Sequence, residues 1–266
     1  MAAYFTAYVG GREADGADWL APEKLIYQLS RMKDDLDSLA DQAYAAIRED
    51  ILRGRLAPGT PLSRRRLADD LEMSVVPIAE ALRRLEDDRL VESRARVGTR
   101  VRVHTDEDVR ALYELREALE TQSARLFSQR ATPGQRGEIR RLAQQLDVLF
   151  SRLAANADDA AFRYAVHTHH VQFHMRVAEY ARSPLLTSMI ERQHVLILNW
   201  LFDLTGRRTP LPPGFHTRLA DALTSREIER ADAEMRAHVR YGLTEVAGQM
   251  QTMAASEWRE PRKTGR

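Results

Sequence analysis

Hydrophobic residues recur at helical spacing over much of the chain, and this period predicts three short amphipathic helices beginning near residue 38. The first covers residues 38–53, and a Pro-Gly turn follows it at residues 56–62. The second and third helices begin at Ser63 and Ser74, because serine is a favoured N-cap residue and an apolar periodic run follows each of them. Three short helices joined by tight turns predict a helix-turn-helix.

The hydrophobic period changes to two residues over residues 90–103, where valine alternates with arginine. This alternation predicts two short strands, with a turn supplied by Val97-Gly98 between them. Three helices followed by a small hairpin predict a winged helix-turn-helix domain over residues 38–104.

From Asp106 onward every periodic segment is helical, and six helices are predicted. They cover residues 106–130, 133–155, 158–182, 184–205, 214–224 and 226–255. The fold class is therefore mainly α, with an N-terminal winged helix-turn-helix and a C-terminal all-α helical bundle at residues 105–255. Residues 1–37 are predicted to be an N-terminal extension, and residues 256–266 a C-terminal tail.

Composition narrows the class of protein. Of the 266 residues, 44% are hydrophobic and 30% are charged, which is typical of a helix-rich protein with a real core. The chain has no cysteine, which excludes a disulfide framework, a thiolate zinc site and a cysteine nucleophile. The N-terminus lacks the basic region of a signal peptide and no apolar stretch is long enough to cross a membrane, so we expect a cytoplasmic protein.

Arginine is concentrated in two stretches of the predicted winged helix-turn-helix. These are Arg64, Arg65 and Arg66 at the start of the second helix, and Arg94, Arg96, Arg100 and Arg102 in the hairpin. The net charge of the chain is only +1, so this basic signal is local. Charge runs are usually solvated faces, but in this fold the same positions suit contacts to DNA phosphates and to the minor groove.

Several motifs occur together in the stretch LAPGTPLSRRRLADDLEMSVVPIAEALRRLEDDRLVESRARVGTRV: a PG turn, SxRxLA, PxxEALxxL and a glycine in the hairpin. This stretch resembles the DNA-binding domain of the GntR family of bacterial regulators. The following DVRALYELREALE is similar to the start of the six-helix effector domain in the FadR/FCD branch, of the VanR-like type. The resemblance runs from about residue 38 to residue 250.

The resemblance implies which residues touch operator DNA. Arg65 matches a DNA-contacting arginine and Gly98 matches the wing-tip glycine, but Val75 and Ala79 stand where the family carries two base-reading arginines. A bidentate Arg–guanine contact discriminates between bases by roughly 1–3 kcal/mol. Because both arginines are absent, we expect the protein to read its operator less specifically, or to prefer a different base sequence. The candidate DNA-binding residues are Arg64, Arg65, Arg66, Ser74, Val75, Arg94, Arg96, Gly98 and Arg100.

Histidines cluster in the helical half, and four of them lie in VHTHHVQFH. His170 and His174 are four residues apart on one helix face, with His167 one turn earlier, whereas His169 points off that face. Imidazoles one turn apart begin a metal site that ligands from other helices can complete. The ordinary alternative is a polar surface or core histidine, which we expect for His169 and for His194 in Glu191-x-x-His194.

The family resemblance implies a fuller ligand set. Metal-binding members carry an Asp and a His in a DxxFH pattern, followed by one His on each of the last two helices. HVQFH places His174 on the first His, and His216 and His238 match the later two, but His170 stands where the family has Asp. Four imidazoles suit Zn²⁺, or Ni²⁺, better than Mn²⁺; alternatively, His170 turns aside.

Arg116 matches an arginine that, in the family, helps hold a carboxylate effector near the metal. Its alternative role is an i, i+4 partner for Glu120 on the helix surface. The sequence thus predicts a homodimeric transcriptional regulator that binds double-stranded operator DNA and responds to a small organic acid, and we expect it to act as a repressor. The alternative is a metal-dependent hydrolase whose His cluster activates water, although no motif places an acid/base carboxylate near those histidines.

Overall fold

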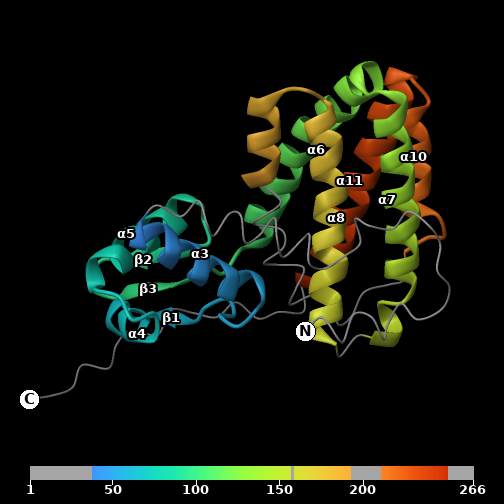
Figure 1. Cartoon of the computed structure of the whole chain (residues 1–266). Helices are drawn as coiled ribbons and strands as arrows, with labels where there is room; N and C mark the ends of the chain where they lie inside the picture. Colours follow the sequence, from blue (N-terminus) through green and yellow to red (C-terminus); the bar gives the residue numbers. More distant parts are fainter. Residues whose placement is uncertain (1–37, 157–158, 193–210, 251–266) are drawn as a thin grey trace, which may run out of the picture. The chain divides into compact units, whose positions relative to one another are not determined.

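The computed structural model describes residues 38–156, 159–192 and 211–250 (Figure 1). Backbone packing divides these described residues into two compact units: those up to Ile47 together with Ser63–Leu85, and Arg48–Leu62 together with those from Glu86 onward. The predictions for residues 1–37, for His194 and for the C-terminal tail lie outside the described residues.

The three predicted N-terminal helices are all present. They are α3 (Leu39–Leu52), α4 (Arg64–Asp70) and α5 (Val75–Asp87). The predicted caps also form at the first two, because the Ser38 hydroxyl accepts from the Asp41 amide at 3.2 Å and Ser63 caps α4 by accepting from the Arg66 amide. Helix α5 begins directly after Ser74, as expected.

Residues 71–74 make the tight turn between α4 and α5, and Glu72 takes an unusual backbone conformation in it. Its φ of 53° lies in the left-handed region, where glycine is the usual residue because it has no Cβ to clash with the backbone. Glu72 therefore adopts the conformation that the helix-turn-helix requires, at some cost in conformational strain. The packing residues behind the turn, Ala68, Ile78 and Leu82, are buried as predicted.

The strands form a three-stranded sheet, so the prediction of a simple hairpin was incomplete. Strand β1 (Pro61–Leu62), which was expected to be part of a turn, pairs antiparallel with β3 (Gly98–Val101), and β3 also pairs with β2 (Val91–Arg94). The β2–β3 turn is made by residues 95–97 rather than by Val97-Gly98, and Arg96 takes a φ of 64° in it. Gly98, with a φ of 127°, opens β3.

The helical bundle contains the predicted helices, the first of them with its predicted bounds, and the predicted ends at residues 205 and 255 lie outside the described residues. They are α6 (Asp106–Arg130), α7 (Pro133–Ser151), the short 3-10 helix η1 (Ala154–Asn156), α8 (Ala160–Tyr180), a helix at 184–192, α10 (Phe215–Thr224) and α11 (Ile228–Met250). Thr105 and Thr132 open α6 and α7 with complete capping boxes, in which Asp108 and Gln135 return the hydrogen bond. Helix α8 begins directly after its N-cap residue Asp159, whose carboxylate accepts from the Phe162 amide.

Long helices lie side by side in the bundle: α11 packs along α6, and α7 packs against both α8 and α10 (Figure 1). Their facing sides are apolar, with Phe127, Ile139, Leu146, Phe173 and Leu219 fully buried. None of the described helices is long and apolar enough to cross a membrane.

The charged side chain of Arg136 is buried in this bundle. Its guanidinium donates to the carbonyl oxygens of Ser128 (2.7 Å), Ala131 (3.1 Å) and Leu223 (3.3 Å). These carbonyls lie at the C-terminal ends of α6 and α10, where the last turns leave acceptors without intrahelical partners. Arg136 therefore caps two helix ends at once.

Candidate functional site

Three helices bring four histidines together inside the bundle. His170 and His174 come from successive turns of α8, His216 from the first turn of α10, and His238 from the middle of α11. His174, His216 and His238 are buried, and His170 is half-buried. The four histidines therefore lie close together, as the sequence analysis expected. Their role as metal ligands stays a prediction.

The ring nitrogens of three of these histidines form a small triangle. The Nε2 atoms of His170 and His174 are 3.1 Å apart, those of His174 and His238 3.2 Å, and those of His170 and His238 3.3 Å. Zinc–imidazole bonds are about 2.0–2.1 Å long, so nitrogens that share one ion lie roughly 2.9–3.4 Å apart. The spacing of the three nitrogens therefore fits one divalent ion.

The protonation of His170 and His238 also suits a metal. Burial, reinforced by the neighbouring imidazoles, lowers the pKa of His170 and of His238 well below the usual value. Neutral imidazole keeps a lone pair on one ring nitrogen, and only that form can ligate a metal. The donor set present is therefore the set that a borderline-soft ion such as Zn²⁺ or Ni²⁺ prefers.

Two carboxylates contact the Nδ1 atoms of two of these histidines, and the sequence analysis assigned neither carboxylate to the site. Glu120, on α6, contacts Nδ1 of His174 through Oε2, and Asp147, on α7, lies 2.9 Å from Nδ1 of His216 through Oδ1. A carboxylate at Nδ1 holds the proton there and leaves Nε2 as the lone-pair nitrogen, as in carboxylate–histidine–metal triads. For His174, this places the lone pair within the triangle.

Asp147 also organises the start of α10. Helix α10 begins after Gly214, which offers no side-chain cap, and Asp147 accepts from the backbone amides of His216 (2.9 Å) and Thr217 (3.0 Å) and from the Thr217 hydroxyl (2.6 Å). Partial burial alone would raise the pKa of Asp147, but these hydrogen bonds and the one from the His216 ring lower it to about 2. Asp147 is therefore an ionised cap supplied by another helix.

His216 does not belong to the group of three whose ring nitrogens lie together. Its ring is nevertheless close, with its centroid 5.1 Å from that of His170 and 5.5 Å from that of His238, similar to the 5.5 Å between His170 and His238. Its role as a fourth ligand stays a prediction. His167 packs edge-on against Phe150, with ring centroids 6.0 Å apart, and Nδ1 of His169 lies 2.7 Å from the Ala165 carbonyl, so neither belongs to the triangle.

Arg116 is buried next to this site and is engaged by one of its carboxylates. Nε of Arg116 donates to Oε1 of Glu120 at 2.8 Å, and the guanidinium carbon lies 5.0 Å from the centre of the Tyr113 ring. The i, i+4 pair with Glu120 that the sequence offered as an alternative does form, but inside the bundle instead of on its surface. A role for Arg116 in holding an effector stays a prediction.

The candidate DNA-binding residues are mostly exposed. In α4 and at the start of α5, Arg64, Arg65, Arg66, Ser74 and Val75 are all exposed, and so are Arg94, Arg96 and Gly98 in the wing. Arg100 differs, because its side chain is only 12% exposed and its Nε donates to Glu92 on β2 at 2.7 Å. The structure thus holds Arg100 within the sheet rather than presenting it like its neighbours Arg94 and Arg96.

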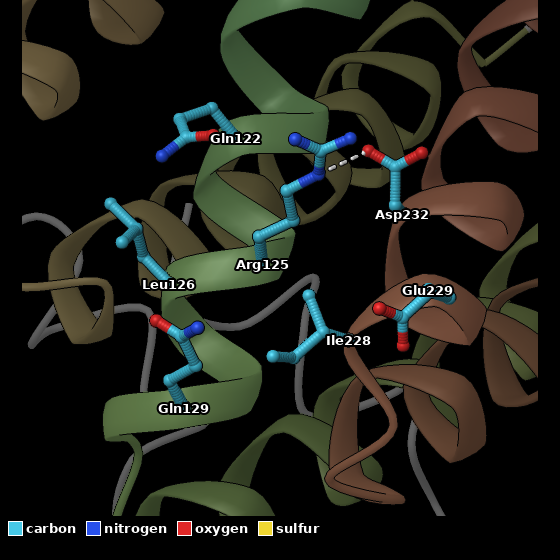
Figure 2. A pocket seen from close by; sticks show the side chains of 7 residues that line it. All are labelled: Gln122, Arg125, Leu126, Gln129, Ile228, Glu229 and Asp232. Carbon is cyan, nitrogen blue, oxygen red and sulfur yellow. Dashed lines mark hydrogen bonds and ion pairs between the residues drawn. The ribbon is translucent and has the colours of Figure 1, made fainter.

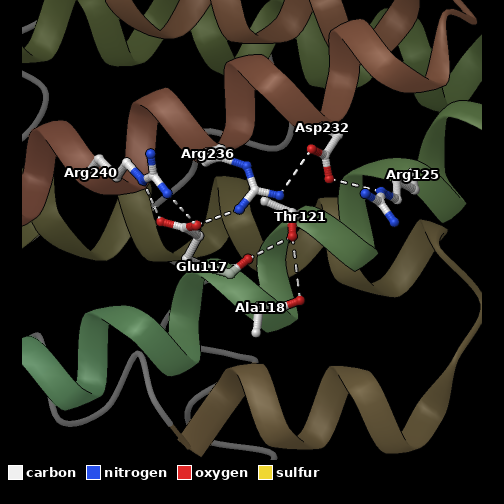
Figure 3. A network of polar contacts seen from close by, with 7 residues as sticks. All are labelled: Glu117, Ala118, Thr121, Arg125, Asp232, Arg236 and Arg240. Atoms are coloured by element: carbon white, nitrogen blue, oxygen red, sulfur yellow. Dashed lines mark hydrogen bonds and ion pairs between the residues drawn. The ribbon is translucent and has the colours of Figure 1, made fainter.

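A surface network of charges joins α6 to α11 (Figure 3). Glu117 accepts from Nε of Arg240 at 2.7 Å and also pairs with Arg236, while Asp232 accepts from Arg125 at 2.8 Å and from Arg236 at 3.1 Å. Hydrogen bonds from the two arginines lower the pKa of Glu117 against the opposing effect of burial, with Arg240 the larger contributor. Exposed pairs of this kind add little stability each and are screened by salt.

A groove of about 500 Å³ lies on the same two helices (Figure 2). Its lining residues are Gln122, Arg125, Leu126, Gln129, Ile228, Glu229 and Asp232. None of the four site histidines lines it, and the ion pair between Arg125 and Asp232 runs along its edge. We therefore assign the candidate chemistry to the histidines and not to this groove.

These features define the class of protein: a helix-turn-helix with a small sheet, followed by an all-helical domain with histidines gathered inside it. Residues 39–101 match the family model of bacterial regulatory proteins of the gntR family, and residues 111–241 match that of the FCD domain. The chain belongs to the GntR family of bacterial transcriptional regulators and carries an FCD domain.

Individual relatives agree with this assignment. A probable D-xylose utilization operon transcriptional repressor of Paenarthrobacter nicotinovorans is 38% identical over 34% of this chain, but the match spans only 39% of that protein. The HTH-type transcriptional regulator YdhC of Bacillus subtilis (strain 168), which is uncharacterized, is 25% identical over 74% of this chain and 86% of its own length.

Two solved structures share the fold. E. coli McbR/YncC superposes with a TM-score of 0.65 at 21% identity, over 80% of this chain and 99% of that one. A GntR transcriptional regulator from Rhodococcus sp. RHA1 gives a TM-score of 0.64 at 22% identity, over 79% of this chain and 97% of that one. At these identities, the likeness establishes the mainly helical two-part fold alone.

Proposed function

We propose that this GntR-family regulator is a repressor whose operator affinity is set by a small carboxylate effector bound at a divalent metal in the helical domain. The observation that carries the proposal is the triangle of His170, His174 and His238, whose Nε2 atoms lie 3.1–3.3 Å apart inside the bundle. The sign of regulation rests on the word repressor in the name of the P. nicotinovorans relative, of which this chain covers 39%.

His170, His174 and His238 would hold the metal, with His216 as the fourth imidazole. Zn²⁺ is the first expectation and Ni²⁺ the second, because both accept an all-imidazole donor set. When bound, the metal supplies a Lewis-acidic position that a carboxylate oxygen can occupy. Glu120 and Asp147 act through the histidines they touch, by fixing each ring's orientation and keeping the proton on Nδ1.

The charges around the site indicate an anionic effector. Arg116 contributes one positive charge, and Glu120 and Asp147 contribute one negative charge each, so the side chains alone leave this region with an excess of one negative charge. A divalent ion on neutral imidazoles changes this balance to one net positive charge. A small monocarboxylate would then complete a neutral site, with the neighbouring Arg116 as a cation able to pair with it.

Helix α6 connects this site to the DNA-binding half in sequence. Glu120 and Arg116 lie on α6, and the N-cap of the same helix, Thr105, comes four residues after β3 ends. Its first turn is fixed by the capping box of Thr105 and Asp108 and by the ion pair of Asp108 with Arg102, at 2.9 Å. Effector binding at the metal site beside Arg116 would act on operator affinity through this helix in a homodimer that occupies two half-sites.

The proposal is tested by metal content and operator binding measured together. We expect the purified protein to bind the DNA upstream of its own gene in a gel shift, with affinity that falls steeply with salt and changes on chelation or addition of small organic acids. His174→Ala should remove the metal and the effector response. His169→Ala is the matched control on the same helix, because that ring lies on the Ala165 carbonyl, outside the triangle.

The competing function, a metal-dependent hydrolase, gives a different outcome in the same experiments. Failure to bind any operator-like DNA, together with metal-dependent turnover of ester or amide substrates, would establish the enzyme and exclude the regulator. Full metal content in His174→Ala would instead remove the site assignment and leave the DNA-binding function standing.

A further inference from the structure

The outward face of α5 begins with apolar side chains that the fold does not use. Val75 is 43% exposed and Val76 is 75% exposed, although each is a large aliphatic residue. The packing side of α5 is made by Pro77, Ile78, Ala81, Leu82 and Leu85, all of them buried. The two valines at the start of the helix are therefore available to a partner.

Helical geometry places one of these valines on the midline of the free face. At about 100° per residue, the buried positions of α5 centre on the side of Leu85, and Val76 and Arg83 lie opposite it. Ala79 stands between the midline and Val75. The first turn of α5 thus presents an aliphatic surface, and the charged side chain of Arg83 comes two turns later.

The partner of this face follows from the family, because the helix after the tight turn is the one that a helix-turn-helix lays in the major groove. Val75, Val76 and Ala79 offer no side-chain hydrogen bonds, so they cannot pair with the donors and acceptors of base edges. The apolar group among the major-groove base edges is the C5-methyl group of thymine. Aliphatic side chains at the start of the helix are therefore chemically matched to thymine.

We propose that Val75 and Val76, with Ala79, read thymine methyl groups, so that each operator half-site carries thymine where the family's usual arginines would select guanine. This inference rests on the DNA-binding function of the chain. Exposed Arg64, Arg65 and Arg66 on α4, in the same compact unit, would supply phosphate contacts that set register without reading sequence.

The test starts from operators selected by the full-length protein from randomised duplex DNA. In each selected half-site, single thymines are replaced by deoxyuridine, which removes the methyl group and leaves every hydrogen-bonding group in place. Burial of one methyl group corresponds to about a fourfold change in affinity, so we expect a loss of about fourfold at one or two thymines and no change at the others.

Two further arms separate methyl reading from a general effect of the base replacement on the duplex. At a sensitive position, 5-methylcytosine should bind better than cytosine by the same factor that separates thymine from deoxyuridine. Val76→Ser should abolish the deoxyuridine effect at one position, whereas Leu39→Ser, a matched loss of an exposed aliphatic side chain on α3, should preserve it. Far-ultraviolet circular dichroism checks that both variants remain folded.

The experiment distinguishes a failure of thymine-methyl reading from a failure of DNA binding. Selected operators that bind tightly but show no position sensitive to deoxyuridine, or an effect unchanged in both Val76→Ser and Val75→Ser, overturn methyl reading and leave DNA binding intact. A protein that enriches no sequence from the randomised pool overturns the inference and counts against the regulator function as well.

Discussion

Replacing Asp147 by asparagine should destabilise the helical bundle by about 2 kcal/mol near neutral pH. The carboxylate accepts four hydrogen bonds from His216 and Thr217, and its side chain is only 19% exposed. Against the raising effect of burial, these bonds lower its pKa from 3.8 to about 2, and each pKa unit is worth about 1.4 kcal/mol of differential stabilisation. Asparagine keeps the shape but loses the charge that this stabilisation requires.

The stabilisation by Asp147 depends on pH, in the direction that its pKa shift sets. Because the folded pKa lies below the unfolded one, the stabilisation is complete above about pH 5 and falls as the pH passes from 3.8 towards 2, to roughly half at pH 3. The assay is urea denaturation of the wild type and of Asp147→Asn from pH 7 to pH 3, with a chelator present throughout. Asp221→Asn is the control, because that side chain is 56% exposed and its ion pair with Arg140 measures 4.0 Å. A difference that stays constant from pH 7 to pH 3, or that Asp221→Asn matches, would refute the reasoning.

Three other substitutions give separate expectations. Glu120→Gln should weaken metal binding about 10- to 100-fold in a chelator competition, because it removes the charge behind His174; an unchanged affinity would mean that this carboxylate does not support the ligand. Arg136→Lys should lower the free energy of unfolding by about 2–3 kcal/mol, since one ammonium cannot reproduce the guanidinium's three bonds to helix-end carbonyls, and equal stability would contradict this. Glu72→Gly should raise the stability of the helix-turn-helix by about 1 kcal/mol in thermal denaturation, since glycine relieves the left-handed strain; a loss would show that the Glu72 side chain contributes more than the strain costs.

The elements that were predicted well are those whose signals are local. Ser38 and Ser63 indicate helix starts within three residues of the hydrogen bonds they make, and the helical period continues through each long segment. Strand β1 was missed because it is two residues long and exists only through its pairing with β3, far along the chain. The wing turn was predicted too late in the chain, because it is made by residues 95–97 and Arg96 already takes a positive φ before Gly98.

In the candidate site too, residues with a local sequence signal were predicted, and residues placed by long-range packing were missed. His170 and His174 were predicted together because a spacing of four residues on one helix is visible in the sequence, and the family resemblance added His216 and His238. Glu120 and Asp147 carry no such signal, since a carboxylate within a helix usually faces solvent. Their contacts with His174 and His216 join different helices and depend on how α6 and α7 pack in the bundle.

The buried pair of Arg116 and Glu120 is better accounted for by the site than by the stability of the bundle. Removing two charges from water costs about as much as their attraction returns, so an apolar pair of similar volume would serve the core equally well. Here each oxygen of Glu120 contacts a different partner: Oε1 accepts from Arg116, and Oε2 contacts His174. Arg116 therefore acts on the imidazole through Glu120 whether or not it also touches an effector. A loss of effector response in an Arg116 variant can be assigned to effector contact only if its metal affinity is unchanged.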